Sequence, residues 1–309
     1  MVQADQARSP LVGFIGLGAM GAPMAARLAS AGHGLMLLDM NRTRAVELAA
    51  ELGAVAAETP AEVGAGCDTV VTMLPSSDIV NAVLAGETGL LSTLRPGSIL
   101  VEMSSGVPAR TCEFAERLAA QGVRLCDAPV SGGVPRAKTG ELAIMVGGND
   151  ADIAAITPLL SAMGSSIMPT GPVGSAHAMK ALNNLVSAGG FLIGIEALLI
   201  GSRYGLSAER MVDVLNASTG MNNSTQKKFK QYVLSRRFDA GFGLDLMVKD
   251  LGIALAVAAE TGTTAPFASL CRDIWAGSQK LLGPGQDHTA VAKFSELLAG
   301  STLEADQHQ

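Results

Sequence analysis

Aromatic side chains, paired cysteines and an excess of positive charge are all scarce in this chain of 309 residues. Aromatic residues make up only 4% of it. Its four cysteines form no C-x-x-C pair, and its four histidines show no metal-ligand spacing with the cysteines or with each other. We therefore expect neither a disulfide framework nor a metal site. Unpaired thiols of this kind are typical of a cytoplasmic protein.

The charge balance argues against a nucleic-acid partner. Lys and Arg number 22 against 28 Asp and Glu, which gives a formal net charge of -6. Such a chain lacks the positive field that attracts phosphate backbones. Charged residues make up 16% of the chain and hydrophobic residues 48%, a balance that indicates a folded globule rather than disorder.

Two segments bear on membranes. The first ten residues are polar, so we expect neither a secretory signal nor an anchor there. Residues 185–202 are mostly apolar, but Glu196 interrupts them and Lys180 precedes them, and a charge near the centre of a bilayer is costly. We expect a buried helix here and no membrane partner.

The order of the expected elements changes near residue 170. Before that point, β-rich runs alternate with helical patterns, which is typical of β-α-β units. Strands are predicted at residues 11–15, 35–38, 69–73, 98–102, 124–128, 142–146 and 166–168. After the Pro- and Gly-rich residues 169–174, helical spacing takes over. Helices are predicted at residues 175–203, 207–216, 224–234, 244–261, 266–281 and 289–298, followed by a polar tail at 304–309.

A glycine-rich segment follows the first predicted strand directly. It consists of Gly16, Leu17, Gly18, Ala19, Met20 and Gly21, a G-x-G-x-x-G pattern. Between a strand and a helix, this pattern is typical of a Rossmann dinucleotide site, in which backbone N-H groups at the helix start bind a pyrophosphate. A tight turn without a ligand is the alternative.

Asp39 ends the second predicted strand, about 20 residues after the first of these glycines. A carboxylate at this position accepts hydrogen bonds from the ribose hydroxyls of NAD and repels the 2'-phosphate of NADP. NAD is therefore the expected cofactor, and NADP is less favoured. Arg42 is either a solvated helix residue or a ligand for that phosphate.

Two further groups of residues could carry chemistry. Ser131, Gly132 and Gly133 follow a predicted strand, where their backbone N-H groups could bind a carboxylate or form only a turn. Lys180 and Asn184 share one helix face, and a lysine there is either a proton donor and acceptor or a residue that extends to solvent at a helix end.

The remaining candidates are a histidine and a charged pair. His177 precedes Lys180 by three residues; we expect it to be partly exposed, with electrostatic tuning of Lys180 as the alternative. Lys249 and Asp250 are either part of a cofactor or substrate site or an ordinary surface ion pair.

Four segments in this order resemble the β-hydroxyacid dehydrogenase family, which includes 3-hydroxyisobutyrate dehydrogenases and tartronate semialdehyde reductases. The segments are residues 13–28 (GFIGLGAMGAPMAARL), 127–148 (DAPVSGGVPRAKTGELAIMVGG), 174–184 (GSAHAMKALNN) and 244–250 (LDLMVKD). The resemblance spans nearly the whole chain. It implies an α/β Rossmann-like N-terminal domain, residues 1–172, followed by an all-α C-terminal domain, residues 173–309, in a homodimer or homotetramer.

The resemblance also implies a role for each candidate residue. Gly16–Gly21 would bind the pyrophosphate and Asp39 the ribose of NAD. Met73, Leu74 and Pro75 would line the cofactor path, and Ser105 and Lys249 would approach the nicotinamide. Ser131, Gly132 and Gly133 would bind the carboxylate of a small substrate, Lys180 would be the acid or base, and Asn184 would orient the reacting oxygen.

The substrate within the family stays open. Residues 219–224 are polar and contain no tryptophan, which favours a more polar substrate than 3-hydroxyisobutyrate, while the role of Asn223 is undetermined. An imine reductase and a catalytically silent binding module are the alternatives. Both usually replace the catalytic lysine, so Lys180 favours the dehydrogenase.

Overall fold

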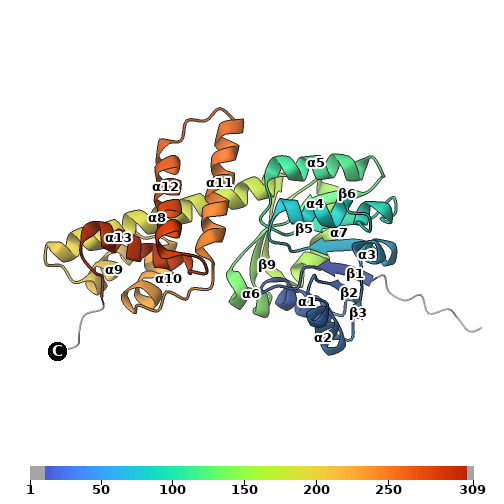
Figure 1. The fold of residues 1–309 in the computed structure, drawn as a ribbon, viewed down its shortest axis with the longest axis horizontal. Coiled ribbons are helices and arrows are strands. Elements are labelled where there is room, and N and C mark those ends of the chain that lie inside the picture. The colour runs from blue at the N-terminus through green and yellow to red at the C-terminus, as the bar shows by residue number, and fades with distance from the viewer. Residues whose placement is uncertain (1–10, 305–309) are drawn as a thin grey trace, which may run out of the picture. The chain divides into compact units, whose positions relative to one another are not determined.

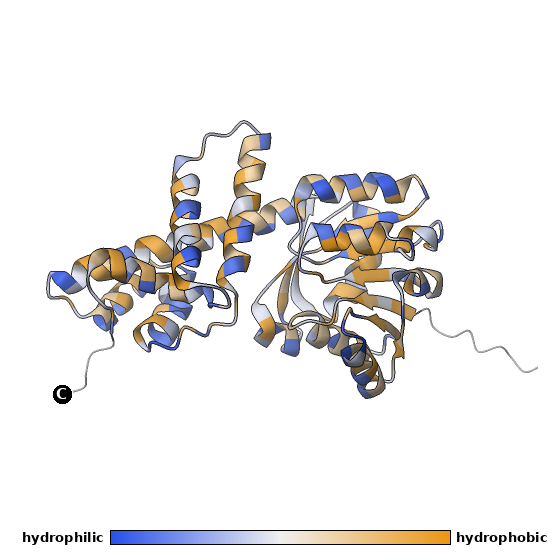
Figure 2. Ribbon diagram, viewed as in Figure 1, coloured by the Kyte–Doolittle hydropathy of each residue, from blue (hydrophilic) through white to orange (hydrophobic). Residues whose placement is uncertain are grey.

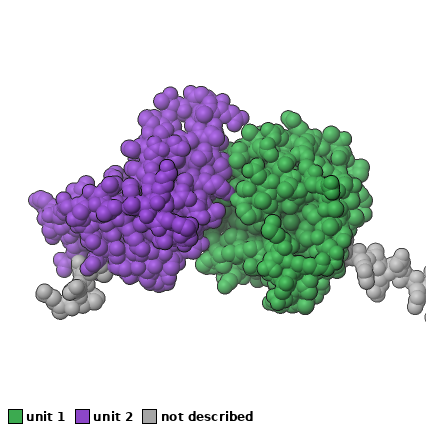
Figure 3. All heavy atoms as spheres, viewed as in Figure 1, with its two compact units in different colours: residues 1–180 green, residues 181–309 purple. Residues whose placement is uncertain are grey.

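The computed structural model describes residues 11–304, so the expectations for the polar segments at both ends lie mostly outside the described residues. The chain divides into two compact units, residues 1–180 and 181–309, called unit 1 and unit 2 below (Figure 3). The boundary expected after residue 172 lies slightly earlier in the chain and stays a prediction.

Unit 1 contains a nine-stranded sheet (Figure 1). Its strands are β1 (Leu11–Ile15), β2 (Leu35–Leu38), β3 (Val55–Ala56), β4 (Cys67–Thr72), β5 (Ile99–Glu102), β6 (Arg124–Asp127), β7 (Val130–Ser131), β8 (Leu142–Gly147) and β9 (Gly164–Gly171). The order is β3-β2-β1-β4-β5-β6-β8-β7, and β9 pairs with β8. The first six strands in the chain run parallel, whereas β8 is antiparallel to β6 and β7. Every predicted strand is present, and β3 and β7 are additional.

Helices cover both faces of this sheet. They are α1 (Gly21–Ser30), α2 (Arg42–Leu52), α3 (Pro60–Gly66), α4 (Ser77–Ala85), the 3₁₀ turn η1 (Leu90–Ser92), α5 (Pro108–Ala119), α6 (Gly133–Thr139) and α7 (Asp150–Ser161). Local residue types start and end α2: the Asn41 side chain accepts a hydrogen bond from the Arg44 N-H, and Gly53 ends the helix at a φ of 64°.

Alternate strand residues fall into two separate cores. One face packs α1, α2, α6 and α7 around Phe14, Val71 and Val101. The other face packs α3, α4 and α5 around Ile15, Val70 and Leu100. Figure 2 shows the strands mostly in orange, as expected for a parallel sheet buried on both sides. Because β1 lies between β2 and β4, the crevice at the carboxyl ends of β1 and β4 is the expected ligand site.

Unit 2 is helical. Helix α8 (Ser175–Arg203) begins in unit 1 and continues into unit 2. The others are α9 (Ala208–Asn216), α10 (Asn223–Lys227), the π-helix η2 (Phe229–Leu234), α11 (Leu244–Glu260), α12 (Pro266–Leu282), the 3₁₀ turn η3 (His288–Ala290) and α13 (Val291–Ala299). The single helix predicted over residues 224–234 is wrong in one respect: it breaks at Lys228, whose φ is -128°.

Helix α8 is long and apolar enough to cross a membrane by length and composition alone, but half of its most apolar window is buried. Phe191, Ile195 and Leu198 from this helix belong to the core of unit 2. Phe191 also makes edge-on ring contacts with Phe229 and Trp275. Residues 185–202 are thus a core helix of unit 2, as the sequence indicated.

Candidate active site

The three glycines after β1 have different surroundings. Gly16 has a φ of +99°, and a Cβ there would overlap the Met73 carbonyl oxygen. A Cβ at Gly21 would overlap the Gly16 carbonyl oxygen. At Gly18 a Cβ would meet no described atom within 4 Å, so the backbone faces open space there. This combination of a tight turn, close helix packing and one open backbone position fits the pyrophosphate of a dinucleotide.

The start of α1 adds an anion site next to this turn. Within residues 11–304, no side chain caps the helix at Met20. Ala22 donates its N-H to the Gly18 carbonyl and Pro23 has no N-H, so the donors for an anion are the backbone N-H groups that precede Ala22. These groups and the helix dipole favour a bound anion. The turn lies at the carboxyl edge of the sheet, where Met73 donates its N-H to the Ile15 carbonyl.

Asp39 is held in place by the same turn. Its Oδ2 accepts from the Leu17 N-H at 2.6 Å, and its Oδ1 accepts from the Asn41 N-H at 2.8 Å. Because a carboxylate offers about four lone-pair positions, both oxygens keep acceptor capacity for ribose hydroxyls. Arg42 instead pairs with Glu58, and this hydrogen bond and charge lower the pKa of Glu58.

One cation near this site was missed by the sequence reasoning. Arg44 donates from Nη2 to the Gly18 carbonyl at 3.4 Å. Arg44 lies in the first turn of α2. The sequence alone does not show that this turn lies beside the glycine turn, so the contact could not be predicted from it.

We predict that kcat/KM is higher with NADH than with NADPH, because Asp39 places a fixed negative charge where the 2'-phosphate would lie. Steady-state kinetics with both cofactors measure this directly. Asp39→Ser should reduce the preference. A higher kcat/KM with NADPH in the unmodified enzyme would contradict the ribose assignment and make Arg42 or Arg44 the phosphate ligand.

The other residues expected along the cofactor and substrate lie beside strand ends. Met73, Leu74 and Pro75 follow β4, and Leu74 donates its N-H to the Ser104 hydroxyl at 2.8 Å. Ser105 follows β5 and is half-buried. The Ser131–Gly133 segment leads from β7 into α6. Gly132 and Gly133 have φ values of 135° and 67°, which side chains rarely adopt, and anion binding there stays a prediction.

His177 is not partly exposed as expected: it is only 1% exposed and lies in a buried charged cluster. Its Nε2 lies 3.0 Å from Glu102 Oε2 and 3.0 Å from the Ser104 carbonyl oxygen. Its Nδ1 lies 2.8 Å from the Thr111 hydroxyl. Asp127 accepts the backbone N-H groups of Gly174 and His177, each at 2.8 Å, and so caps the start of α8.

The partners of His177 identify its protonation state. The Thr111 hydroxyl donates to the Val107 carbonyl, so it accepts from Nδ1-H. Nε2 faces a carbonyl and a carboxylate, which only accept, so it also carries a hydrogen. His177 is therefore an imidazolium. Burial alone would lower its pKa, but the charge and hydrogen bond of Glu102, with the charge of Asp127, raise it above the ordinary value.

The pKa of Glu102 is shifted in the opposite direction. Burial alone would raise its pKa, but the His177 charge and hydrogen bond, with hydrogen bonds from Ser104, hold the pKa below the ordinary value. Glu102 and Asp127 are register partners at the ends of adjacent parallel strands. The cluster therefore fastens the ends of β5 and β6 to the first turn of α8, one turn before Lys180.

We predict that His177→Gln lowers the free energy of unfolding by about 3–5 kcal/mol, because it leaves the Glu102 carboxylate buried without its cation. The double variant His177→Gln/Glu102→Gln should recover much of this loss. Chemical denaturation measures both. Equal destabilisation by the single and double variants would show that the ion pair does not exist.

The loss of unfolding free energy caused by His177→Gln should depend on pH, because both His177 and Glu102 titrate. The contribution of His177 is complete below its ordinary pKa of 6.5 and disappears as pH rises through its raised value. The contribution of Glu102 is complete above its ordinary pKa of 4.5 and disappears as pH falls through its lowered value. The difference between the unmodified protein and His177→Gln should thus be largest between pH 4.5 and 6.5.

Lys180 and Asn184 are both buried on one face of α8, with exposures of 8% and 7%. The alternative of a lysine that extends into solvent is therefore wrong. Asn184 donates from Nδ2 to Asp250 Oδ2 at 2.6 Å, and Asp250 is itself 1% exposed. Lys249 Nζ lies 3.4 Å from the other Asp250 oxygen. The Lys249–Asp250 pair is thus not an ordinary surface pair, and the sequence reasoning missed Asp250 as the residue that orients Asn184.

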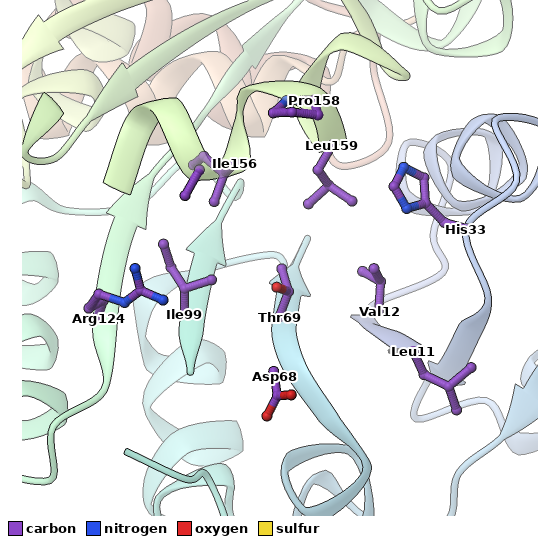
Figure 4. Close-up of a pocket in the computed structure, with 11 residues that line it drawn as sticks. Leu11, Val12, His33, Asp68, Thr69, Ile99, Arg124, Ile156, Pro158 and Leu159 are labelled. Carbon is purple, nitrogen blue, oxygen red and sulfur yellow. The ribbon is translucent and has the colours of Figure 1, made fainter. Parts of the chain in front are cut away.

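A cavity of about 290 Å³ lies at the opposite edge of the sheet (Figure 4). Its lining includes Leu11, Thr69, Ile99 and Arg124, each at or near the first residue of its strand. Side chains of α7, including Leu159, form the other wall. Since open parallel sheets bind ligands at their carboxyl ends, this cavity is not the candidate cofactor site.

The open sheet, the glycine turn and Asp39 define a dinucleotide-binding domain joined to a helical unit. Sequence-family models agree: residues 11–171 match the NAD binding domain of 6-phosphogluconate dehydrogenase, and residues 174–295 match the NAD-binding domain of NADP-dependent 3-hydroxyisobutyrate dehydrogenase.

Individual proteins match over most of the chain. The chain is 35% identical to 2-(hydroxymethyl)glutarate dehydrogenase of Eubacterium barkeri, over 97% of this chain and 99% of that protein. It is 37% identical to mitochondrial 3-hydroxyisobutyrate dehydrogenase of Mus musculus, over 85% and 80%. A structure of 3-hydroxyisobutyrate dehydrogenase from Mycobacterium tuberculosis with L-serine aligns with a TM-score of 0.84 at 32% identity, over 93% and 99%. The chain belongs to the β-hydroxyacid dehydrogenase family and is an NAD-binding oxidoreductase.

Proposed function

We propose that the protein is an NAD-dependent dehydrogenase that transfers hydride between the nicotinamide and a small 3-hydroxy acid or its semialdehyde, of the 3-hydroxyisobutyrate or tartronate semialdehyde type. The observation that supports this most is the buried pair Lys180 and Asn184 on α8, with Asn184 held by Asp250. An amine and an amide fixed on one helix face suit an alcohol or carbonyl oxygen.

The proposed chemistry needs one proton carrier and one oxygen ligand. NAD, when bound, supplies the hydride acceptor. In the oxidation direction, the neutral amine of Lys180 takes the hydroxyl proton as hydride leaves the carbon; in the reduction direction, the ammonium returns that proton to the oxygen. The Asn184 amide has two N-H groups, of which Asp250 accepts one, so the second is available to the reacting oxygen.

The remaining site residues would bind the cofactor and the substrate. Gly16–Gly21 and Asp39 hold the pyrophosphate and ribose in this proposal, and Met73, Leu74 and Pro75 line the path to the nicotinamide. Ser105 and Lys249 act on the nicotinamide side, and Ser131, Gly132 and Gly133 bind the substrate carboxylate. A cytoplasmic location is part of the same proposal, supported by four free cysteines.

Two other activities are compatible with the fold. An imine reductase or a catalytically silent binding module would need no lysine at position 180, and both usually lack it. An assay that follows NADH absorbance separates the three, with 3-hydroxyisobutyrate, tartronate semialdehyde, succinic semialdehyde, 2-(hydroxymethyl)glutarate and a cyclic imine as substrates. Turnover of the cyclic imine alone would replace the proposal, and no turnover of any substrate would favour the binding module.

We predict that Lys180→Ala lowers kcat by about 10²- to 10⁴-fold on the best substrate, because a general acid or base is lost. The Kd for NADH, measured by fluorescence titration, should change by no more than a few fold. Lys180→Arg should not restore turnover, because a guanidinium stays protonated and cannot accept the hydroxyl proton. If Lys180→Ala keeps more than about a tenth of kcat, proton transfer belongs to another group.

We also predict a homodimer or homotetramer. Helix α8 carries an apolar stripe on the face opposite Lys180: Leu182, Val186, Ile193 and Ile200 are 39%, 76%, 56% and 71% exposed. Apolar surface of this extent on one helix is typical of a subunit interface. Light scattering reports the mass in solution. A single species of 31.5 kDa at micromolar concentration would contradict the prediction.

A further inference from the structure

The turn after β5 lies on the side of the sheet that suits the second half of a dinucleotide. The strand order β3-β2-β1-β4-β5-β6 is that of a sheet that binds a dinucleotide across the crevice at its carboxyl edge. The proposed adenosine ligands, the glycine turn and Asp39, follow β1 and β2. The nicotinamide half therefore belongs over the carboxyl ends of β4, β5 and β6. Residues 103–106, called the β5 turn below, come directly after β5.

Ser104 ties the β5 turn to three other segments of unit 1. It is fully buried. Its N-H donates to Glu102 Oε1 at 2.9 Å, and its hydroxyl accepts from the Leu74 N-H at 2.8 Å. Its carbonyl oxygen accepts from His177 Nε2 at 3.0 Å. Because buried polar groups are seldom left without partners, these three contacts hold the backbone of the turn in one position.

Gly106 brings the other end of the β5 turn against the same imidazolium. A Cβ at this position would lie 2.8 Å from His177 Cε1 and 3.0 Å from its Nδ1, closer than van der Waals contact. The φ of Gly106 lies outside the left-handed region, so the close approach of the ring, not the backbone conformation, calls for glycine here. His177 thus contacts the turn on both sides of Ser105.

The His177 ring is itself held at both nitrogens. Its Nδ1 donates to the Thr111 hydroxyl at 2.8 Å, and its Nε2 also lies 3.0 Å from Glu102 Oε2. Glu102 ends β5, and Thr111 lies in the first turn of α5, which follows the β5 turn. The elements on either side of the turn therefore bind the same imidazolium, and the ring cannot move without moving the turn.

We propose that His177 is a positioning residue for the nicotinamide half of NAD, and that it acts through the Ser104 carbonyl and Gly106 on the β5 turn against which that half lies. The inference rests on the placement of NAD in the proposed function. His177 is too deeply buried to touch the cofactor itself. Its loss should weaken the contacts of the nicotinamide half and spare those of the adenosine half.

The test compares the Kd of NADH with that of ADP, which lacks the nicotinamide half, by isothermal titration calorimetry. Two double variants remove both buried charges. Glu102→Gln/His177→Phe leaves the Ser104 carbonyl without its donor, whereas Glu102→Gln/His177→Gln keeps an N-H donor. The first should raise the Kd of NADH by about tenfold and that of ADP by less than about twofold. The second should keep the Kd of NADH within about threefold of the unmodified protein.

Single variants test the contact from the turn and control for stability. Gly106→Ala pushes the β5 turn away from the His177 ring, so it should raise the Kd of NADH and not that of ADP. Leu160→Ala empties a buried position on α7, an element that makes none of the contacts above. It should lower the Tm and change neither Kd. Asp39→Ala should raise both Kd values, because both ligands carry the adenosine ribose.

Equal increases in both Kd values, or an unchanged Kd of NADH, in Glu102→Gln/His177→Phe would overturn the proposal. Weaker NADH binding in Leu160→Ala would overturn it as well, since lost stability alone would then explain the effect. Failure of the proposed function is distinguishable, because these measurements need no substrate. An unmodified protein that binds NADH but turns over no substrate would contradict the proposed function and leave the comparison of NADH with ADP intact.

Discussion

The start of α8 depends on a group of charges that the protein buries completely. Glu102 and Asp127 end two neighbouring parallel strands, and like charges in a low-dielectric interior would repel each other strongly. The His177 imidazolium lies against Glu102 and near Asp127, and Asp127 in turn accepts two N-H groups from the start of α8. Removal of His177 would leave two buried carboxylates without a cation, and removal of Asp127 would leave two N-H groups of α8 without their acceptor. The three residues therefore specify one position for the helix start.

Two opposite faces of helix α8 serve different purposes. One face carries Lys180 and Asn184 near the start of the helix, and Phe191, Ile195 and Leu198 follow on the same face and belong to the core of unit 2. The opposite face presents the exposed apolar stripe. The buried charges at the start of α8 therefore fix the turn that leads into the proposed proton carrier, Lys180.

The sequence predicted the features that depend on local signals. The Asn41 cap and Gly53 defined α2, and the strand-to-helix context of Gly16–Gly21 identified the dinucleotide turn. It did not predict β3 and β7, because strands of two residues have too few positions to show a period. The break at Lys228 was also missed, since the apolar spacing runs through it.

The missed site residues are those whose role comes from another part of the chain. His177 was expected in a partly exposed first turn because nothing in its own helix indicates Glu102, which is far away in sequence. Asp250 was missed for the same reason, because its buried contact with Asn184 joins residues 66 positions apart. The burial of His177 could have been predicted from the strand ends. Glu102 and Asp127 end adjacent parallel strands, and buried carboxylates there need a cation or a hydrogen-bond donor.

The distribution of charge also bears on selectivity. Only 16% of residues are charged, yet Glu102, Asp127, Lys180 and Asp250 are all buried on or against α8, and Lys228 is largely so. With 4% aromatic residues, the chain has few large rings with which to measure substrate shape. One methylene in an apolar pocket changes kcat/KM by only about 10- to 200-fold, whereas an unpaired buried polar group can change it by about 10⁴-fold or more. A site built from buried polar and charged groups should therefore discriminate substrates by the position of their polar groups more sharply than by the length of their carbon chains.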